Sequence, residues 1–242
     1  HPDGTGLEQL TDDPAFDDQG VLSPDGNRLA FVSTRERGTA DVWVLDLDTG
    51  LYLNLTNNQS GNFRPSWSPD GGWIAFTSDR DSQPGNNPGM WEHLQSTGVY
   101  LMRPDGTALR RLTRTGGVAG SPSWSPDGQD VLFYETDEVG AYLAKNGRSR
   151  TEIVSVDVTT GERTLYTASA ETKLSPTLLP EGRISYVSRS GGETGGLRIR
   201  HPSRRVETII AGSVRNPSWS PDGEYVVYER ITRLGSTEHL IP

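Results

Sequence analysis

The chain of 242 residues is acidic, with a formal net charge of −9, and 32% of its residues are hydrophobic. This length is enough for one large domain with a substantial core, while the charge disfavours a nucleic-acid backbone or an anionic membrane surface as the main partner. The absence of Cys excludes disulfides and thiolate metal sites, and no apolar run reaches the roughly 20 residues that a membrane-spanning helix needs. The first residue is His1 rather than Met, so we expect that an upstream segment has been removed.

In chain order, one motif recurs and divides the sequence into units. P-S-W-S-P-D-G stands at residues 65–71, 122–128 and 217–223, with weaker copies at 21–26 and 177–182. Pro and Asp favour the corners of a tight turn, and Gly accepts the positive φ that closes it. The residues after each copy form a near-continuous apolar run. This pattern predicts a hairpin whose second strand is covered on both faces.

The residue before Pro-Asp-Gly marks each unit. These marker residues are Ser23, Ser68, Ser125, Leu179 and Ser220. Successive markers are 41 to 57 residues apart, which leaves room for four short strands in each unit. Four-stranded units repeated around an axis are the blades of a β-propeller. We therefore predict an all-β fold, a β-propeller of five four-stranded blades.

The whole chain, residues 1–242, is predicted to form this single propeller domain. The expected blades are about 16–57, 62–114, 119–168, 172–211 and, for blade five, 214–242 together with 1–11. Blade five is assigned from the two ends of the chain: residues 1–11 match 103–113, and residues 236–242 are in phase with 96–102. We expect residues 7–11 to pair as the outer strand with residues 239–241, which closes the ring and leaves no long free edge.

The W-S-P-D-G turn and the fourth-strand pattern L-x-x-L-T resemble the blades of the TolB-type propellers. Such blades also occur in the N-terminal domains of prolyl-oligopeptidase-like peptidases, in some amidohydrolases and in oligogalacturonate lyases. The resemblance covers nearly the whole chain and implies the fold, whereas the same blade serves many functions. It also implies six blades where this sequence counts five, so either the ring has five blades or one lies outside the sequence.

Two kinds of loop predict two different faces of the ring. The turns between strands one and two and between strands three and four of each blade are tight. The loops between strands two and three and between blades are longer, with insertions at 79–98 and 136–150. Long loops on a rigid scaffold are where binding usually occurs. In the first insertion, we expect partner binding by Asp79, Arg80, Asp81, Met90, Trp91, Glu92 and His93, with Trp91 as anchor. The alternative is that Trp91 folds back over its blade.

The candidate metal ligands in the sequence are a cluster of acidic residues and four histidines. Asp12, Asp13, Asp17 and Asp18 crowd the first loop and suggest a weak Ca²⁺ site, although their spacing matches no calcium-binding motif, and a solvated acidic loop is the alternative. The histidines His1, His93, His201 and His239 show no metal-ligand spacing. We therefore expect no cofactor other than this weak Ca²⁺.

The first strand of each blade should begin at the mouth of a central channel. Alignment on the markers places Gln19, Arg64, Ser121, Ser175 and Asn216 there. This polar mixture suits a water-filled channel or hydrogen-bonded recognition of a peptide end. It lacks a ring of carboxylates or imidazoles, and the sequence has no G-x-S-x-G or phosphate-binding loop.

These observations favour a protein without catalytic residues. We expect a protein-binding propeller in the periplasm or secreted, which docks a protein partner on its long-loop face as a scaffold or peripheral subunit of an envelope or membrane-bound assembly. The alternative is an enzyme, either a metal-dependent polysaccharide lyase or a propeller that accompanies a hydrolase domain.

Overall fold

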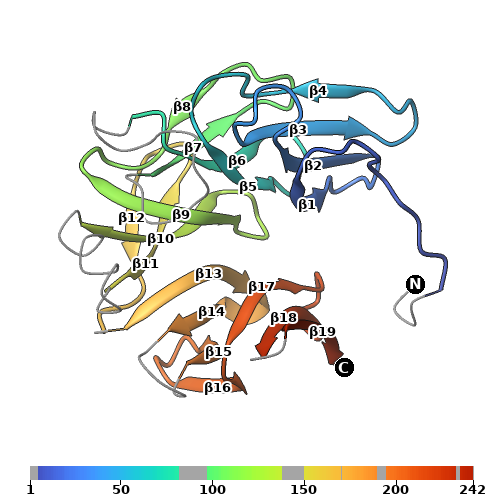
Figure 1. The fold of residues 1–242 in the computed structure, drawn as a ribbon. Helices are drawn as coiled ribbons and strands as arrows, with labels where there is room; N and C mark the ends of the chain where they lie inside the picture. Colours follow the sequence, from blue (N-terminus) through green and yellow to red (C-terminus); the bar gives the residue numbers. More distant parts are fainter. Residues whose placement is uncertain are drawn as a thin grey trace.

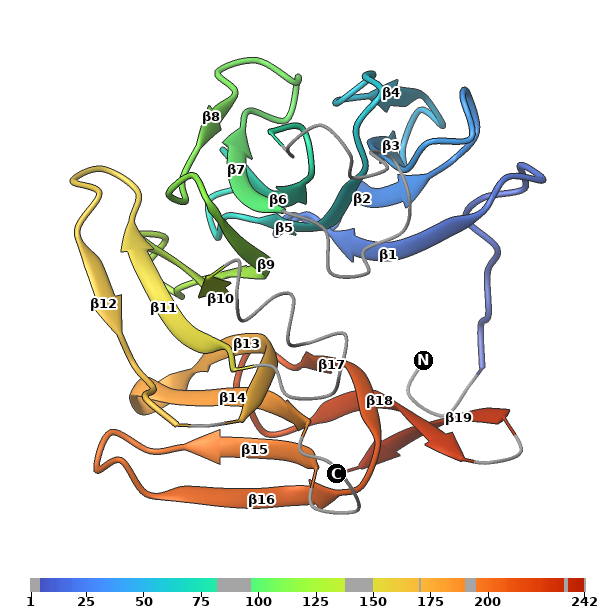
Figure 2. The same ribbon diagram turned by 60° about the vertical axis from the view of Figure 1, so that its left-hand side comes forward.

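The computed structural model describes residues 5–81, 97–137, 150–169, 171–189, 195–232 and 235–241. The strands form five antiparallel sheets arranged around a common centre, with the first strand of each sheet innermost (Figures 1 and 2). Four of the sheets have four strands each, and the last has three. The predicted propeller architecture of antiparallel four-stranded sheets is therefore observed for the first four blades.

The sheets follow the chain in simple up-and-down order. Blade one comprises β1 (Asp17–Leu22), β2 (Arg28–Ser33), β3 (Asp41–Asp46) and β4 (Tyr52–Asn54). Blade two comprises β5 (Asn62–Trp67), β6 (Ile74–Ser78), β7 (Gly98–Met102) and β8 (Arg110–Arg111). Blade three comprises β9 (Gly117–Trp124), β10 (Asp130–Asp137), β11 (Glu152–Asp157) and β12 (Arg163–Leu165).

The last two blades differ from this scheme in detail. Blade four comprises β13 (Thr172–Leu179), β14 (Arg183–Arg189), β15 (Gly196–Arg200) and β16 (Val206–Ala211), with the short helix η1 (Pro180–Gly182) in place of the tight turn. Blade five comprises β17 (Val214–Trp219), β18 (Val226–Thr232) and β19 (Gly235–Ile241). The degenerate T-L-L-P-E-G sequence thus still turns the chain, but through a different geometry.

The marker serine builds the turn at the start of each regular blade. In blade two the Ser68 hydroxyl donates to the Asp70 carboxylate over 2.5 Å and accepts from the Trp73 N–H over 2.8 Å. Ser23, Ser125 and Ser220 make the same pair of bonds. Ser68 is 2% exposed, so these bonds satisfy a hydroxyl that water hardly reaches.

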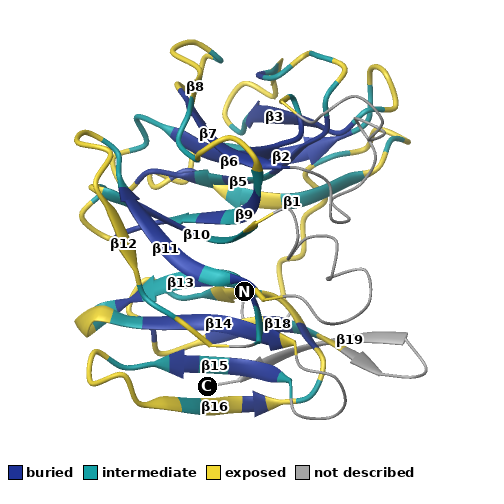
Figure 3. Ribbon diagram, turned by 90° about the vertical axis from the view of Figure 1, so that its left-hand side faces the viewer, coloured by how far each residue is buried: buried dark blue, intermediate teal, exposed yellow. Residues whose placement is uncertain are grey.

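Apolar side chains fill the spaces between neighbouring sheets. Ala30, Val44 and Phe76 belong to the cluster between blades one and two, and equivalent clusters lie between each further pair of neighbours. The central strands are buried and the outer strands are exposed (Figure 3). The expectation that second strands are covered on both faces is confirmed, since every residue of β6 is buried.

The motif tryptophans tie each blade to the one before it. The Trp67 Nε1–H donates to the Val21 carbonyl over 3.2 Å, and the Trp124 Nε1–H donates to the Ser66 carbonyl over 3.0 Å. Trp219 donates to the Ser185 hydroxyl over 2.7 Å. The repeated W-S sequence is therefore a contact between blades as well as the end of a strand.

The structure does not confirm the predicted closure of the ring. Residues 7–11 form no strand, and blade five has three strands, with β19 paired only to β18 among the described residues. The side chain of Leu7 is 96% exposed. At its end nearest blade one, this segment is held by the Tyr52 hydroxyl, which donates to the Leu10 carbonyl over 3.4 Å. The four-stranded fifth blade and its closing strand are therefore not confirmed and stay predictions.

Candidate functional site

The five residues predicted at the channel mouth share an unusual backbone conformation. Each lies in the first strand of its blade with a positive φ: 57° at Gln19, 54° at Arg64, 51° at Ser121, 49° at Ser175 and 46° at Asn216. At each position the pairing with the second strand shifts register, which is a β-bulge. Bulges re-aim side chains and are common beside functional sites. The strands that carry these five bulges, β1, β5, β9, β13 and β17, lie around the centre of the molecule (Figure 2).

Three of these residues meet across the centre. The backbone N–H of Arg64 donates to the Gln19 side-chain carbonyl over 2.7 Å, and the Arg64 guanidinium donates to the Asn216 side-chain oxygen over 2.8 Å. The amide of Asn216 in turn donates to the Glu229 carboxylate over 2.9 Å. This chain of bonds joins blades one, two and five, and it fixes the Arg64 guanidinium between them.

Two further arginines take part in the electrostatics of this region, because Arg189 is repelled by both Arg64 and Arg215. Burial lowers the pKa of the Arg189 guanidinium, and the positive charges of Arg215 and Arg64 lower it further. The side chains of Arg189 and Arg215 are nevertheless exposed in part, so a ligand has access to them. We call Arg64, Arg189 and Arg215 the arginine cluster. Like charges brought together favour the binding of an anion.

The sequence predicted only one member of this cluster. Arg215 directly precedes the mouth residue Asn216, and Arg189 is the last residue of β14, so both come from different blades. The sequence indicated Arg215 indirectly, because it is adjacent to Asn216, one of the predicted mouth positions. Arg189 carried none, because its proximity depends on the curvature that brings blades two, four and five together.

The described part of the predicted partner-binding loop makes contacts within its own blade. Asp79 is 1% exposed and accepts from the Gly61 N–H over 2.8 Å. Arg80 donates to Asn62 over 3.0 Å, and Asp81 accepts from Tyr100 and Arg111. These three residues stabilise blade two. Met90, Trp91, Glu92 and His93 lie outside the described residues, and their partner-binding role stays a prediction.

The four aspartates of the first loop do not gather around one point. Asp17 pairs with Arg35 over 3.0 Å, and Asp13 accepts from the Ala15 N–H over 2.8 Å. Within the described part of the chain, no group of three or more His, Asp or Glu side chains could hold a metal ion. Asp12 and Asp18 add no ligand to such a group, so the geometry gives the proposed weak Ca²⁺ site no support.

Histidine chemistry is limited to one described side chain. The His201 ring lies 3.0 Å from the Glu207 carboxylate in blade four, and this contact lowers the pKa of Glu207. The other three histidines have side chains outside the described set. No helix in the described part of the chain is both long and apolar enough to cross a membrane.

Comparison with known proteins agrees with the propeller fold. Residues 6–85 match the family model of the TolB beta propeller domain. The chain is 39% identical over 137 residues to the "Protein TolB homolog" of Chlorobium luteolum, a match that covers 45% of this chain and 31% of that protein. It is 26% identical over 211 residues to the "Uncharacterized peptidase YuxL" of Bacillus subtilis, covering 85% of this chain and 28% of that protein.

Among solved structures, TolB from Acinetobacter baumannii is similar with a TM-score of 0.77 at 23% identity, covering 99% of this chain and 55% of that one. The chain thus spans about a third or less of these two curated relatives and about half of the TolB structure. The fold and its bulged centre define the class, a β-propeller of antiparallel blades. Within that class, residues 6–85 match the TolB-type propeller repeat, and the rest of the chain is similar to TolB propellers in fold.

Proposed function

We propose that the chain is a non-catalytic, protein-binding propeller that acts outside the cytoplasm, as a scaffold or peripheral subunit of an envelope or membrane-associated assembly. The TolB-type repeats and the similarity to the Chlorobium protein support this role. The observation that carries it is the arginine cluster at the channel mouth, where Arg64 is held by Asn216. Protein partners on the long-loop face are part of the same proposal.

The chemistry of the cluster indicates the kind of partner. A carboxylate bound here would relieve the repulsion that Arg64 and Arg215 exert on Arg189, and guanidinium–carboxylate bonds are among the strongest polar contacts in proteins. The mouth therefore suits an acidic segment of a protein partner. The chain as a whole is acidic, so a local positive site also selects where such a segment docks.

Site-directed photocrosslinking tests this proposal, and the absence of Cys makes it clean. The single-cysteine variant Ser121→Cys, labelled with a benzophenone maleimide and added to envelope extract, should crosslink a discrete protein. The control Asp48→Cys places the same label in an exposed tight turn of blade one and should not. Capture of the same proteins from both positions, or of none from either, would contradict the proposal.

The proposed location has its own measurement. Fractionation of cells that express the native gene product should recover it with the periplasmic or secreted fraction. Recovery with cytoplasmic markers would overturn the extracytoplasmic part of the proposal and leave the binding part intact.

A second candidate is a propeller domain that accompanies a hydrolase. The similarity to the Bacillus protein favours it, because that relative is named a peptidase and this chain spans 28% of it. Assay of the full-length gene product against a panel of short peptides separates the two candidates, since turnover that depends on a domain outside residues 1–242 would establish the second. No described residue favours the polysaccharide lyase alternative.

A further inference from the structure

An arginine of blade one closes the long-loop end of its blade. Arg35 donates through Nε to the Ser33 hydroxyl over 2.9 Å and through Nη2 to Asp17 over 3.0 Å. Its guanidinium lies 5.1 Å from the centre of the Trp43 ring and 4.4 Å from that of Tyr52. The arginine thus covers the end of the apolar core like a plug.

Blade two repeats this plug at the equivalent position. Arg80 donates to the Ser78 hydroxyl over 3.0 Å and to the Asn62 side-chain oxygen over 3.0 Å. Its guanidinium lies 4.8 Å from the centre of the Tyr100 ring. The repeat therefore supplies an arginine, a serine beneath it and an acceptor from the first strand.

Blade three has lost all three parts of the plug. Counted from the marker serine, Asp137 replaces the arginine, Glu135 replaces the serine, and Ala119 replaces the acceptor. A pocket of about 870 Å³ opens here, with Val118, Ala119 and Leu165 among its lining residues. Blades one and two fill this end with Arg35 and Arg80, so the pocket of blade three coincides with the replacement of this arginine, its serine and its acceptor.

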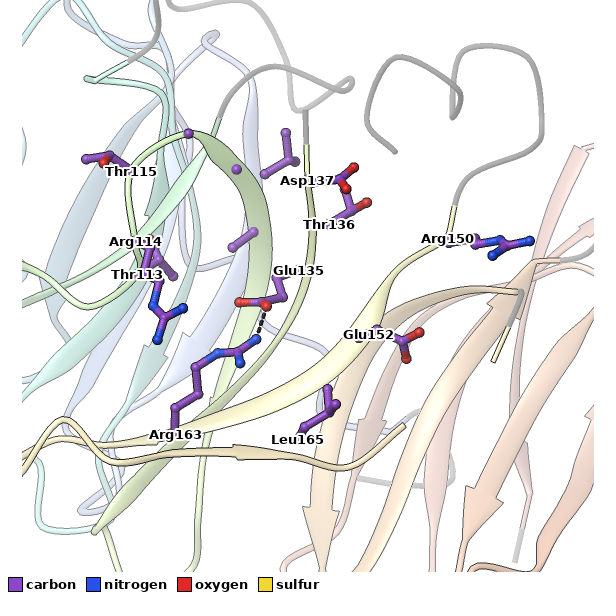
Figure 4. Close-up of a pocket in the computed structure, with 14 residues that line it drawn as sticks. Thr113, Arg114, Thr115, Glu135, Thr136, Asp137, Arg150, Glu152, Arg163 and Leu165 are labelled. Atoms are coloured by element: carbon purple, nitrogen blue, oxygen red, sulfur yellow. Dashed lines mark hydrogen bonds and ion pairs between the residues drawn. The ribbon is translucent and has the colours of Figure 1, made fainter. Parts of the chain in front are cut away.

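Charged side chains surround this apolar floor. Arg163 forms an ion pair with Glu135, and Arg114 points into the same space beside them (Figure 4). Burial lowers the pKa of Arg163, and the nearby charge of Arg114 lowers it further. None of the ion pairs within the described ranges involves Arg114 or Arg150, which also lines the pocket. The Arg114 guanidinium is therefore available to a ligand beside the Arg163–Glu135 pair, whereas Arg150 points away from them (Figure 4).

We propose that this pocket binds a ligand in which a single carboxylate adjoins an apolar group, as at the C-terminus of a peptide. The carboxylate is held by Arg114, next to the Arg163–Glu135 pair, and the apolar group lies on Ala119 and Leu165. Glu135 and Asp137 disfavour a multiply charged anion such as phosphate, because they repel the additional negative charge. This site is separate from the arginine cluster, so it does not rest on the proposed function.

Titration of the ¹⁵N-labelled protein with three probes tests the chemistry. The probes are acetyl-Ala-Ala-Leu with a free C-terminus, its C-terminal amide, and N-acetyl-leucine. We expect the free acid to shift resonances of residues 113–119 and to bind at least about tenfold more tightly than the amide, since a charge-assisted hydrogen bond is lost. Tighter binding of the peptide than of N-acetyl-leucine assigns the ligand to protein C-termini, and equal binding assigns it to small acids.

Two variants test the residues. Arg114→Gln should weaken binding of the free acid about tenfold, while the control Arg37→Gln, an exposed arginine of blade one, should leave it unchanged. The triple variant Ala119→Asn, Glu135→Ser, Asp137→Arg rebuilds the plug of blade two and should fold with an unchanged or higher melting temperature but no longer bind. Equal affinity for acid and amide, tighter binding of acetyl-Ala-Ala-Arg-amide, or full binding by the folded triple variant would overturn the proposal.

Discussion

Lys173 has no exposed surface, yet it carries an ammonium group at the junction of blades three and four. Its Nζ donates to the Thr151 carbonyl over 2.8 Å and to the carbonyls of Ser169 and Glu171 over 3.2 Å each, and it lies 3.3 Å from the Glu152 carboxylate. The equivalent residue of blade two is Asn62, whose amide makes similar bonds. Lys173 therefore links the connection between blades three and four to the start of strand β11.

Replacing Lys173 should be costly for folding. Lys173→Met keeps the length of the side chain but leaves three carbonyls and Glu152 without their donor, so we expect a loss of about 3–5 kcal/mol in the free energy of unfolding. Urea denaturation measures this loss, with the exposed Arg37→Met as control. A loss below about 1 kcal/mol would show that water replaces the ammonium, as at an exposed site.

The turn aspartates predict how stability depends on pH. Hydrogen bonds from the marker serines lower the pKa of Asp25, Asp70, Asp127 and Asp222 below the usual value. A carboxyl whose pKa is lowered by folding adds stability above its unfolded pKa, and this stability is lost as the pH falls through the folded pKa. The melting temperature should therefore decrease when the pH is lowered below about 4. The drop should be smaller in Asp70→Asn, and an identical drop would contradict this origin.

At the scale of the strand and blade, the motif tryptophans should contribute different amounts to the free energy of unfolding. Trp124 is 8% exposed and packs between blades two and three, whereas Trp219 is half-buried in the three-stranded blade five. Trp124→Ala should cost about 3–5 kcal/mol in unfolding free energy through the cavity it leaves, and Trp219→Ala should cost less. Chemical denaturation measures both losses. An equal or larger loss for Trp219→Ala would mean that burial does not determine how much a motif tryptophan stabilises the fold.

The fourth strands show where prediction from sequence ends. In three blades the threonine hydroxyl of the L-x-x-L-T pattern, or its equivalent, accepts from the N–H of the second residue of strand three. The pairs are Thr56 with Val42, Thr113 with Val99 and Thr167 with Ile153. Thr11 has the same local sequence but no such partner in strand β19. The pattern specifies that a segment suits an outer strand, whereas it does not specify which sheet the segment joins.

For the molecule as a whole, the sequence predicted the blades because each turn and each apolar strand is encoded locally and repeated. The four-stranded sheets of the first four blades agree with that prediction, and so do the tight turns at Ser23, Ser68, Ser125 and Ser220. The bonds of Arg64 to Gln19 and Asn216, the repulsion between Arg189 and Arg64, and the pocket of blade three depend on the placement of several blades. These features could be recognised only when the blades were seen together, as Figure 2 shows for the centre.

The central claim is that the arginine cluster at the channel mouth binds a protein partner. Its most direct test is the affinity of the partner captured at Ser121 for the wild type and for the variant Arg64→Gln, Arg189→Gln, Arg215→Gln, measured by titration at matched salt. We expect the variant to bind at least about tenfold more weakly with an unchanged melting temperature. Equal affinity in a folded variant would contradict the account.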